Sequence, residues 1–220
     1  MAELVLIRHG EAVGQGGFNG RRTDPPLSDT GRARAESLRE RMLCDGLLPT
    51  GNSRLLVSPM CRAAETAEIV FGEYLTTGLK RETVDEFAEV DFGEWDGLNW
   101  AQIKKTDEAA FDSWLENPVD ISPPGGESLS AFDKRVMQGL ERALSDAAGA
   151  DCASEQKPDN SRIYITAHGG VIRSIICLLL KLPSDRHLSF QVDCASCSIV
   201  STYRAEDGSV SAVLSKLNIR

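Results

Sequence analysis

Residues 4–10 read LVLIRHG, four apolar side chains followed by an arginine, a histidine and a glycine. A short run that is apolar at every position is typical of a strand covered on both faces of a parallel sheet. The pattern returns at residues 163–167, which lead into His168, Gly169 and Gly170. Two of the three histidines of the chain therefore follow predicted strands, and this coincidence is the main functional signal of the sequence.

Strand-like and helix-like segments alternate along the chain. Strands are expected at 4–7, 54–57 and 163–167, and near 188–193, 197–204 and 210–214. Helices are expected at about 29–45, 60–71, 128–148 and from 170 to about 181, with a polar surface loop at 149–160. This alternation predicts a three-layer α/β/α sandwich with a mostly parallel central sheet, whose ligands bind at the carboxyl ends of the strands.

The 220 residues fit one domain, which we expect to cover residues 1–220. Between 93 and about 127 the helical pattern is broken, and all three tryptophans (Trp95, Trp100 and Trp114) fall in this stretch. We interpret it as a cap-like insertion lying over the site.

The composition excludes several classes of protein. Hydrophobic residues make up 41% and charged residues 26%, as in ordinary soluble domains. The longest apolar run, 175–180, is too short to cross a bilayer, and the net charge of −9 disfavours nucleic acid and anionic lipid as partners. Six cysteines without a signal-peptide pattern suit a reducing compartment, so we expect a cytoplasmic protein.

The residues beside the two histidines indicate the substrate. Arg8 directly precedes His9, and Arg62 follows the second apolar run. We expect these side chains to meet at one edge of the parallel sheet. A guanidinium grips two phosphate oxygens at once and stays charged at any working pH. Gly169 and Gly170 would let a helix N-terminus approach and add amide donors for the same anion.

A neutral imidazole can attack phosphorus without the help of a metal, because its ordinary pKa of about 6.5 leaves a free lone pair at neutral pH. The leaving oxygen then needs a proton. Glu89 is our choice of donor because its apolar sequence neighbours favour a protonated carboxyl. Asp91, Glu94 and Asp96 compete for this role, and the physical chemistry of the sequence alone does not rank the four.

At this point the chain resembles the histidine phosphatase superfamily, which includes the cofactor-dependent phosphoglycerate mutases. The motifs that carry the resemblance are Leu6-Ile7-Arg8-His9-Gly10-Glu11, Asp24-Pro25-Pro26-Leu27-Ser28, Ser58-Pro59 with Arg62 and Thr66, Glu89 with Phe92-Gly93, Pro124-Gly125-Gly126-Glu127-Ser128, and Ala167-His168-Gly169-Gly170. The resemblance implies a phosphoglycerate mutase-like fold. It also implies that His9 is phosphorylated, Arg8 and Arg62 bind phosphate, Glu89 donates the proton and His168 stabilises the transferring group.

Within the superfamily, the segments Gly16-Gly17-Phe18-Asn19-Gly20, Trp100 to Trp114 and Pro123-Pro124-Gly125-Gly126-Glu127 most resemble the alpha-ribazole phosphatases of cobalamin synthesis. One departure concerns an asparagine that many members have shortly after the His-Gly-Glu motif, since residues 12–17 contain none and the next is Asn19. The predicted substrate-binding residues are Arg8, Asn19, Arg21, Arg62 and Gly169. Arg21 and Arg22 are equally compatible with the mouth of the pocket and with a solvated surface.

Two other polar features have structural interpretations. His187 lies in a polar turn without a partner motif, and we expect a surface residue. Cys194 and Cys197 have the spacing of a zinc pair, but with no second pair in the chain we interpret them as buried or half-buried thiols.

We therefore expect two-step hydrolysis of a small-molecule phosphate ester, without metal or cofactor, by a protein for which a homodimer is one candidate assembly. One alternative is a phosphoglycerate mutase, although residues 98–124 offer only Lys104 and Lys105 as cations for a second anionic group. An alternative from another class is an interaction module that keeps the fold without catalysis.

Overall fold

The protein is described by a computed structural model that covers residues 2–14, 16–150, 162–204 and 210–220. A six-stranded sheet runs through these residues in the order β3-β2-β4-β1-β5-β6. The strands are β1 (Ala2–Arg8), β2 (Arg54–Val57), β3 (Lys80–Thr83), β4 (Arg162–Ala167), β5 (Ser196–Arg204) and β6 (Val210–Ile219). The first four run parallel, and β5 pairs antiparallel with both β1 and β6, so the predicted mostly parallel sheet is confirmed.

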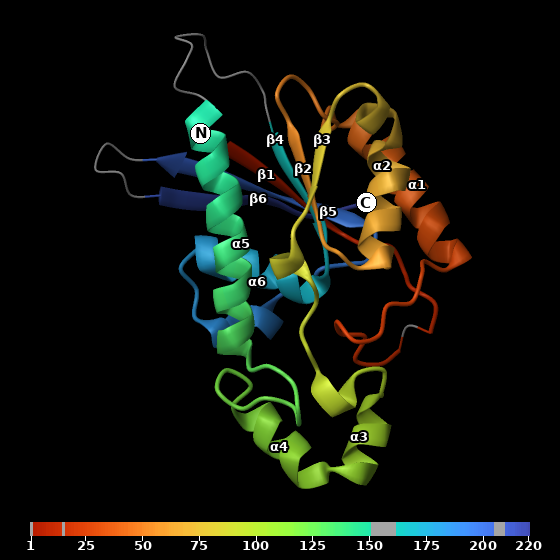
Figure 1. Ribbon diagram of the computed structural model, residues 1–220, viewed down its shortest axis with the longest axis vertical. Coiled ribbons are helices and arrows are strands. Elements are labelled where there is room, and N and C mark those ends of the chain that lie inside the picture. The colour runs from red at the N-terminus through yellow and green to blue at the C-terminus, as the bar shows by residue number, and fades with distance from the viewer. Residues whose placement is uncertain (1, 15, 151–161, 205–209) are drawn as a thin grey trace.

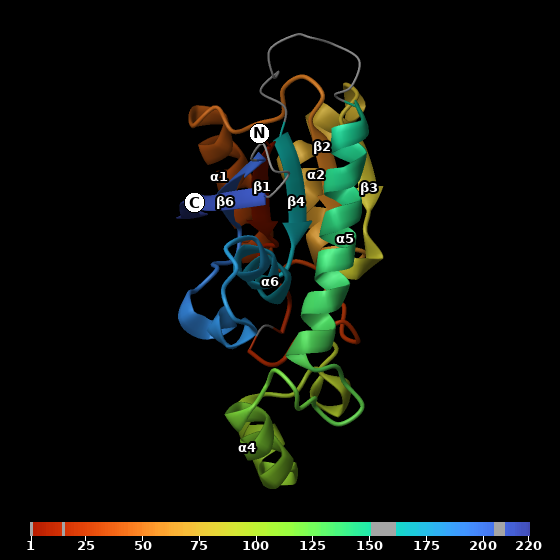
Figure 2. The same cartoon turned by 90° about the vertical axis from the view of Figure 1, so that its left-hand side faces the viewer.

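Helices cover both faces of the sheet, which gives the predicted three layers (Figures 1 and 2). The helices α1 (Asp29–Cys44) and α2 (Cys61–Thr76) pack on one face, and α5 (Leu129–Ala150) and α6 (Gly169–Leu179) pack on the other. Two shorter helices, α3 (Trp100–Thr106) and α4 (Glu108–Glu116), lie beyond the end of the sheet (Figure 1).

The alternation of side chains along β1 explains why its sequence is apolar throughout. Leu4 and Leu6 belong to the core under α5 and α6, whereas Val5 and Ile7 belong to the core under α1 and α2. All four are fully buried. Because successive side chains of a strand point to opposite faces, a strand between two helical layers needs apolar residues at every position.

The helix after the first loop begins where its sequence predicts. Ser28 is the N-cap of α1, and its Oγ accepts a hydrogen bond from the Gly31 N–H at 3.0 Å. Gly31 is also needed for space, because a Cβ there would lie 2.0 Å from the carbonyl oxygen of Glu11. The start of α1 therefore packs directly against the loop that follows His9.

Several predicted segments differ from the structure. The strand expected at 188–193 is wrong, since Ser184–Ser189 form a 3₁₀ helix (η4) and the next strand begins at Ser196. The interval from 93 to 124, predicted to lack helical order, contains the 3₁₀ helix η2 (Gly93–Trp95) as well as α3 and α4. The expected loop at 149–160 begins inside α5, which continues to Ala150, and its remainder lies outside the described residues.

The prediction of a surface position for His187 is also wrong. Its side chain is only 6% exposed, and its Nε2 lies 3.1 Å from Oδ1 of Asp133 on α5. The same carboxylate accepts hydrogen bonds from Ser174 of α6 and Ser184 of η4, both at 2.6 Å. This buried cluster joins η4 to the two helices of one layer.

The two cysteines with zinc-like spacing agree with the prediction of two thiols, since Cys194 is half-buried and Cys197 is buried. Within the described ranges, no three His, Cys, Asp or Glu side chains gather as metal ligands would. Within the same ranges, no helix is both long and apolar enough to cross a membrane.

Candidate active site

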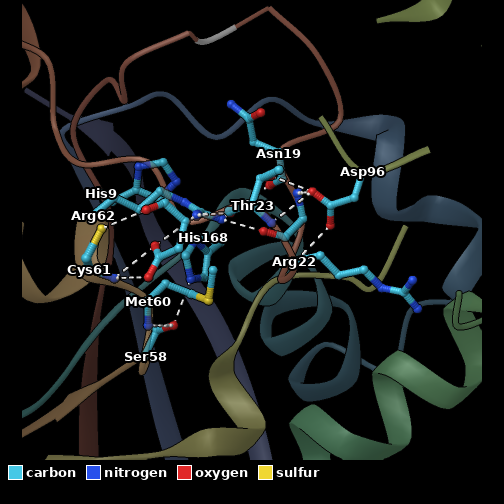
Figure 3. A network of polar contacts seen from close by, with 12 residues as sticks. His9, Asn19, Arg22, Thr23, Ser58, Met60, Cys61, Arg62, Asp96 and His168 are labelled. Atoms are coloured by element: carbon cyan, nitrogen blue, oxygen red, sulfur yellow. Dashed lines mark hydrogen bonds and ion pairs between the residues drawn. The ribbon is translucent and has the colours of Figure 1, made fainter. Parts of the chain in front are cut away.

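Three adjacent parallel strands end at the same edge of the sheet and deliver polar side chains there. His9 follows β1, Ser58 follows β2 and His168 follows β4, which lies between the other two. The ladder continues one residue beyond the strands, because His9 N–H donates to the Ala167 carbonyl and Ser58 N–H to the Thr166 carbonyl, both at 3.0 Å. The imidazole rings of His9 and His168 therefore meet, with centroids 5.0 Å apart and an interplanar angle of 62° (Figure 3).

The surroundings of His9 keep its ring neutral and aim one nitrogen at the site. Burial, followed by the charges of Arg62 and Arg8, lowers the pKa of His9 from 6.5 to about 3. Its Nδ1 lies 2.6 Å from the carbonyl oxygen of Gly10. A carbonyl oxygen only accepts hydrogen bonds, so Nδ1 carries the ring proton. The lone pair of the neutral ring is therefore on Nε2.

A short chain of hydrogen bonds reaches the ring of His168. The N–H of Met60 donates to Ser58 Oγ at 3.3 Å, and Ser58 Oγ lies 2.7 Å from Nε2 of His168 (Figure 3). If the hydroxyl donates to Nε2, the proton of the neutral ring is on Nδ1. Burial, with the neighbouring His9 ring and the charges of Arg62 and Arg8, holds the pKa of His168 well below its ordinary value. Nδ1 is buried and has no hydrogen-bond partner among the described residues.

Arg62 is almost fully buried and is fixed by the loop that precedes α1. Its Nη2 donates to the carbonyl oxygens of Asn19 and Gly20, at 3.2 and 3.0 Å. Its Nη1 donates to the carbonyl of Thr23 at 3.1 Å and lies 3.4 Å from Asp24 Oδ1. Its Nε is buried without a partner in the described part of the chain. The guanidinium is thus held on two sides and keeps one donor free.

Asp96 in turn holds that loop in place. Its carboxylate accepts the backbone N–H groups of Gly20, Arg22 and Thr23 at 3.2, 3.0 and 3.2 Å (Figure 3). Gly20 permits this close approach, because a Cβ there would lie 2.4 Å from Asp96 Oδ2. Asp96 therefore organises the carbonyl groups that bind Arg62.

Arg8 completes a set of unsatisfied nitrogens. Its Nη1 donates to the Val192 carbonyl, and its Nε is buried with no partner among the described residues. A Cβ on Gly169 would lie 3.4 Å from the Arg8 guanidinium carbon, so the start of α6 packs on this side chain. The Nε atoms of Arg8 and Arg62 and the Nδ1 of His168 are thus three buried nitrogens without partners among the described residues, and Nδ1 is a donor when the Ser58 hydroxyl donates to Nε2. Buried donors normally have partners, and a tetrahedral anion would supply them.

Glu89 lies at the N-terminus of α6, in contacts other than the apolar ones expected from sequence. Its Oε1 accepts a hydrogen bond from the N–H of the next residue, Val90, at 3.0 Å. Its Oε2 accepts one from the Gly170 N–H at 3.2 Å. A Cβ on Gly170 would lie only 2.3 Å from Oε1, so the glycine makes room for the carboxyl group.

The structure separates the competing acids by their contacts. Asp91 forms an ion pair with Arg22 at 2.7 Å and accepts from the Gly93 N–H at 2.9 Å. Asp96 is occupied by the loop described above. Glu89, in contrast, contacts the helix that follows His168. This arrangement favours Glu89 over Asp91 and Asp96 as a group that can reach a substrate.

The remaining predicted substrate-binding residues are less closely engaged. Asn19 contributes its backbone carbonyl to Arg62, and its side-chain amide lies outside the network of contacts in Figure 3. The Arg22 guanidinium points away from the two imidazole rings and binds Asp91 and the Gly125 carbonyl (Figure 3). Arg21 is exposed, and its backbone N–H donates to Val90.

Sequence reasoning did not assign roles to Ser58, Thr66 or Arg173. Thr66 Oγ1 accepts from the Gly10 N–H at 3.0 Å and donates to the Arg62 carbonyl at 2.8 Å, linking the His9 loop to α2. Ser58 and Thr66 belong to the motifs that carry the family resemblance, but only their contacts in the structure show which groups they bind. Arg173 follows Gly169 by one helical turn, a spacing that could have singled it out.

Comparison with known proteins agrees with this geometry. Residues 4–214 match the protein family described as the histidine phosphatase superfamily (branch 1). Glucosyl-3-phosphoglycerate phosphatase of Mycobacterium tuberculosis is 31% identical over 184 residues, which cover 82% of this chain and 76% of that protein. A 2,3-bisphosphoglycerate-dependent phosphoglycerate mutase of Parvibaculum lavamentivorans is 29% identical over 192 residues, covering 86% and 85%.

A solved structure shares the fold over nearly all of both chains. The alpha-ribazole phosphatase of Shigella flexneri superposes with a TM-score of 0.78 at 25% sequence identity. The superposition covers 99% of this chain and 96% of the other. The phosphoglycerate mutase-like fold expected from the sequence is confirmed.

Proposed function

The chain belongs to the histidine phosphatase superfamily, and on this premise we propose that it hydrolyses small phosphate monoesters through a phosphohistidine at Nε2 of His9. The observation that supports the proposal most is the set of three buried nitrogens, on Arg8, Arg62 and His168, that are unpartnered among the described residues, together with the neutral imidazole of His9. These nitrogens match an anion with several oxygens and leave the nucleophile uncharged.

In the first step, the lone pair of His9 Nε2 attacks phosphorus, and the bond from phosphorus to the ester oxygen breaks. Arg8, Arg62 and His168 hold the non-bridging oxygens, on which charge is spread in the transition state. Glu89 gives its proton to the leaving oxygen and becomes a carboxylate. The alcohol then leaves, and phosphorus remains bonded to Nε2 while Nδ1 keeps its proton against Gly10.

In the second step, a water molecule attacks phosphorus and gives a proton to the Glu89 carboxylate. The bond between phosphorus and Nε2 breaks, inorganic phosphate is released and His9 returns to its neutral tautomer. Each group ends in its starting protonation state, so the cycle needs no further reactant.

We propose that this cycle is independent of metal ions. The nucleophile is a neutral imidazole with its lone pair already available, and two guanidiniums supply the positive charge that metal ions often provide in phosphoryl transfer. Treatment with a chelator followed by dialysis should leave the rate of ester hydrolysis unchanged. Activity that disappears with chelator and returns with magnesium or zinc would contradict this proposal.

For the substrate, we propose an ester with a planar aromatic part, such as alpha-ribazole 5′-phosphate. The Trp100 side chain is large and hydrophobic yet 54% exposed. Its ring lies 5.4 Å from that of Phe18, the residue directly before the Asn19 and Gly20 carbonyls that bind Arg62. An exposed indole next to this loop offers a surface on which a heterocycle can stack.

A phosphate-release screen tests the function and the substrate together. It compares alpha-ribazole phosphate, phosphoglycerates, sugar phosphates and nucleotides with the wild-type chain and with Trp100→Leu. We expect alpha-ribazole phosphate to give the highest kcat/KM with the wild-type chain. In Trp100→Leu, kcat/KM should fall more for alpha-ribazole phosphate than for the sugar phosphates. Equal losses would contradict the stacking proposal, and a lack of turnover of every ester would favour an interaction module without catalysis.

Phosphoryl transfer to a second hydroxyl is the alternative that the mutase relative favours. A mutase must also hold a second anionic group, and of the two lysines of α3, Lys104 lies 3.4 Å from the Glu108 carboxylate. Interconversion of phosphoglycerates faster than release of inorganic phosphate would support the mutase and contradict the phosphatase.

The setting and assembly of the protein are further proposals. We propose a single domain with residues 93–127 as a cap, acting in the cytoplasm on a small-molecule ester rather than on nucleic acid or a membrane. Among the described residues, Cys44, Cys61, Cys177 and Cys197 are free thiols, which suits a reducing compartment. Light scattering after size exclusion would decide between a monomer and the proposed homodimer.

A further inference from the structure

Arg173 is a half-buried cation on α6 to which the cycle above gives no role. Its Nε is buried, and among the described residues it has no hydrogen-bond partner. Long side chains of a helix lean towards its N-terminus and cover the residues three and four positions earlier. For Arg173 these positions are Gly170 and Gly169, which have no side chains of their own. The guanidinium is therefore directed over the turn of α6 that borders the site.

Two functional groups border the same turn. Gly170 donates its N–H to Glu89, and Gly169 packs against Arg8. Burial lowers the pKa of Arg173, while the charge of Glu89 opposes this change and that of Arg8 adds to it. The charge of Arg173 is thus within electrostatic reach of both the proposed acid and a phosphate-binding arginine.

Building on the proposed function, we propose that Arg173 is a positioning residue that acts through Glu89, stabilising and orienting its carboxylate after the proton has moved to the leaving oxygen. Glu89 changes from a neutral to a negatively charged group in the first step. A permanent positive charge nearby, in a site that excludes much of the solvent, favours the form that this step produces. The Gly170 amide and Arg173 would then hold the carboxylate for the proton of the attacking water.

The test depends on how much the leaving group needs a proton. Para-nitrophenolate is a stable anion and leaves without one, whereas an alkoxide does not. In Arg173→Met we expect kcat/KM for an alkyl phosphate to fall at least about tenfold, because general acid catalysis contributes factors of this size or more. For para-nitrophenyl phosphate we expect a fall of less than about threefold on the same reasoning. Arg173→Lys, which keeps the charge, should recover most of the loss.

A double-mutant cycle with Glu89→Gln identifies the residue through which Arg173 acts. Once Glu89 has lost its acid function, Arg173→Met should change the alkyl phosphate rate by less than about twofold, because the two substitutions then remove the same contribution. Full additivity of the two losses would overturn the proposal. Arg39→Met, on a residue of α1 whose side chain is 41% exposed and paired with Glu73, is the matched control and should behave as wild type.

Other outcomes also contradict the inference. An equal loss of kcat on both substrates would show that Arg173 only supports the fold, and an equal rise of KM and of the inhibition constant of inorganic phosphate would show that it acts through Arg8. If Arg173→Met does not fold, Arg173→Gln and Arg173→Lys give the same comparison. Wild-type protein that hydrolyses neither ester would disprove the proposed function itself, whereas an active wild type with uniform losses would disprove only the role of Arg173.

Discussion

The ring of His9 lies 5.0 Å from that of His168, although one follows the first strand and the other the fourth. The hydrogen bonds that join β1 to β4 fix this distance, because the two strands are adjacent and parallel and end in the same register. Each ring is anchored through one nitrogen, to Gly10 in one case and to Ser58 in the other. The sheet and these two contacts therefore hold the rings side by side.

The two buried imidazoles make stability depend on pH. Burial and neighbouring charges lower the pKa of His9 to about 3 and that of His168 well below 6.5. Below about pH 6.5 the unfolded chain takes up protons that the folded chain does not, so stability falls as the pH falls. We expect the free energy of unfolding in urea to decrease between neutral pH and about pH 5, by up to roughly 1.4 kcal/mol per pH unit for each imidazole.

The control for this pH dependence is His9→Asn, which removes one of the two titrating groups and should reduce the slope. A slope equal to that of wild type would contradict the assignment. His9 stays neutral as a nucleophile throughout this range. A plot of kcat against pH should therefore show no decrease centred on the ordinary pKa of histidine, about 6.5.

Asp96→Asn should weaken phosphate binding more than catalysis. The carboxylate accepts three backbone N–H groups of the loop that holds Arg62, and a single amide oxygen cannot replace them. Hydrogen bonds to a charged group contribute about 1.5 to 3 kcal/mol, so we expect the inhibition constant of inorganic phosphate to rise about tenfold or more. Asp112→Asn, at an exposed position of α4, is the control. An unchanged inhibition constant in Asp96→Asn would contradict the role given to this loop.

Gly170→Ala should displace Glu89 and leave the fold intact. The new Cβ would lie 2.3 Å from Glu89 Oε1, and the flexible carboxyl group must move to relieve the clash. We expect hydrolysis of an alkyl phosphate to slow at least about tenfold and that of para-nitrophenyl phosphate to change little. Gly72→Ala, in α2 with open space around its Cβ position, should be silent. Equal activity of Gly170→Ala and wild type on alkyl esters would count against Glu89 as the acid.

Asp133→Ala should destabilise the fold. Burial tends to raise the pKa of Asp133, but its hydrogen bonds with His187, Ser174 and Ser184 outweigh that effect and leave it below the ordinary value. This contribution to stability is present above about pH 3.8, the unfolded value, and is lost as the pH falls further. Removing the carboxylate leaves its partners unpaired, at a cost of about 3 kcal/mol in urea unfolding at neutral pH. A loss below about 1 kcal/mol would contradict this interpretation.

The sequence predicts the layers of the fold because strands that are buried on both faces, such as β1, β2 and β4, consist mostly of apolar residues. It does not predict β3, since Lys80–Thr83 are polar and form an edge strand whose pairing depends on β2. The helices α3 and α4 were missed because they are 7 and 9 residues long, too short to give a clear periodic pattern.

Part of the candidate site can likewise be predicted from the sequence, and part of it cannot. The proximity of the two histidines follows from the rule that parallel strands share a carboxyl edge. The choice of Glu89 needed the resemblance to a family, because four acids are equivalent in sequence, and contacts separate Glu89 from Asp91 and Asp96 only once the chain is folded. The burial of His187 could not be foreseen, since its partner Asp133 lies on a different helix and no local pattern links them.

Trapping the covalent intermediate tests the central claim most directly. Enzyme mixed with phosphate ester labelled in the phosphoryl group is quenched within one turnover, and the label bound to protein is followed in acid and in alkali. A phosphohistidine at His9 predicts label that survives alkali, is lost in acid and is absent in His9→Ala. Label with the stability of a serine ester or an aspartyl phosphate, or label retained in His9→Ala, would contradict the account.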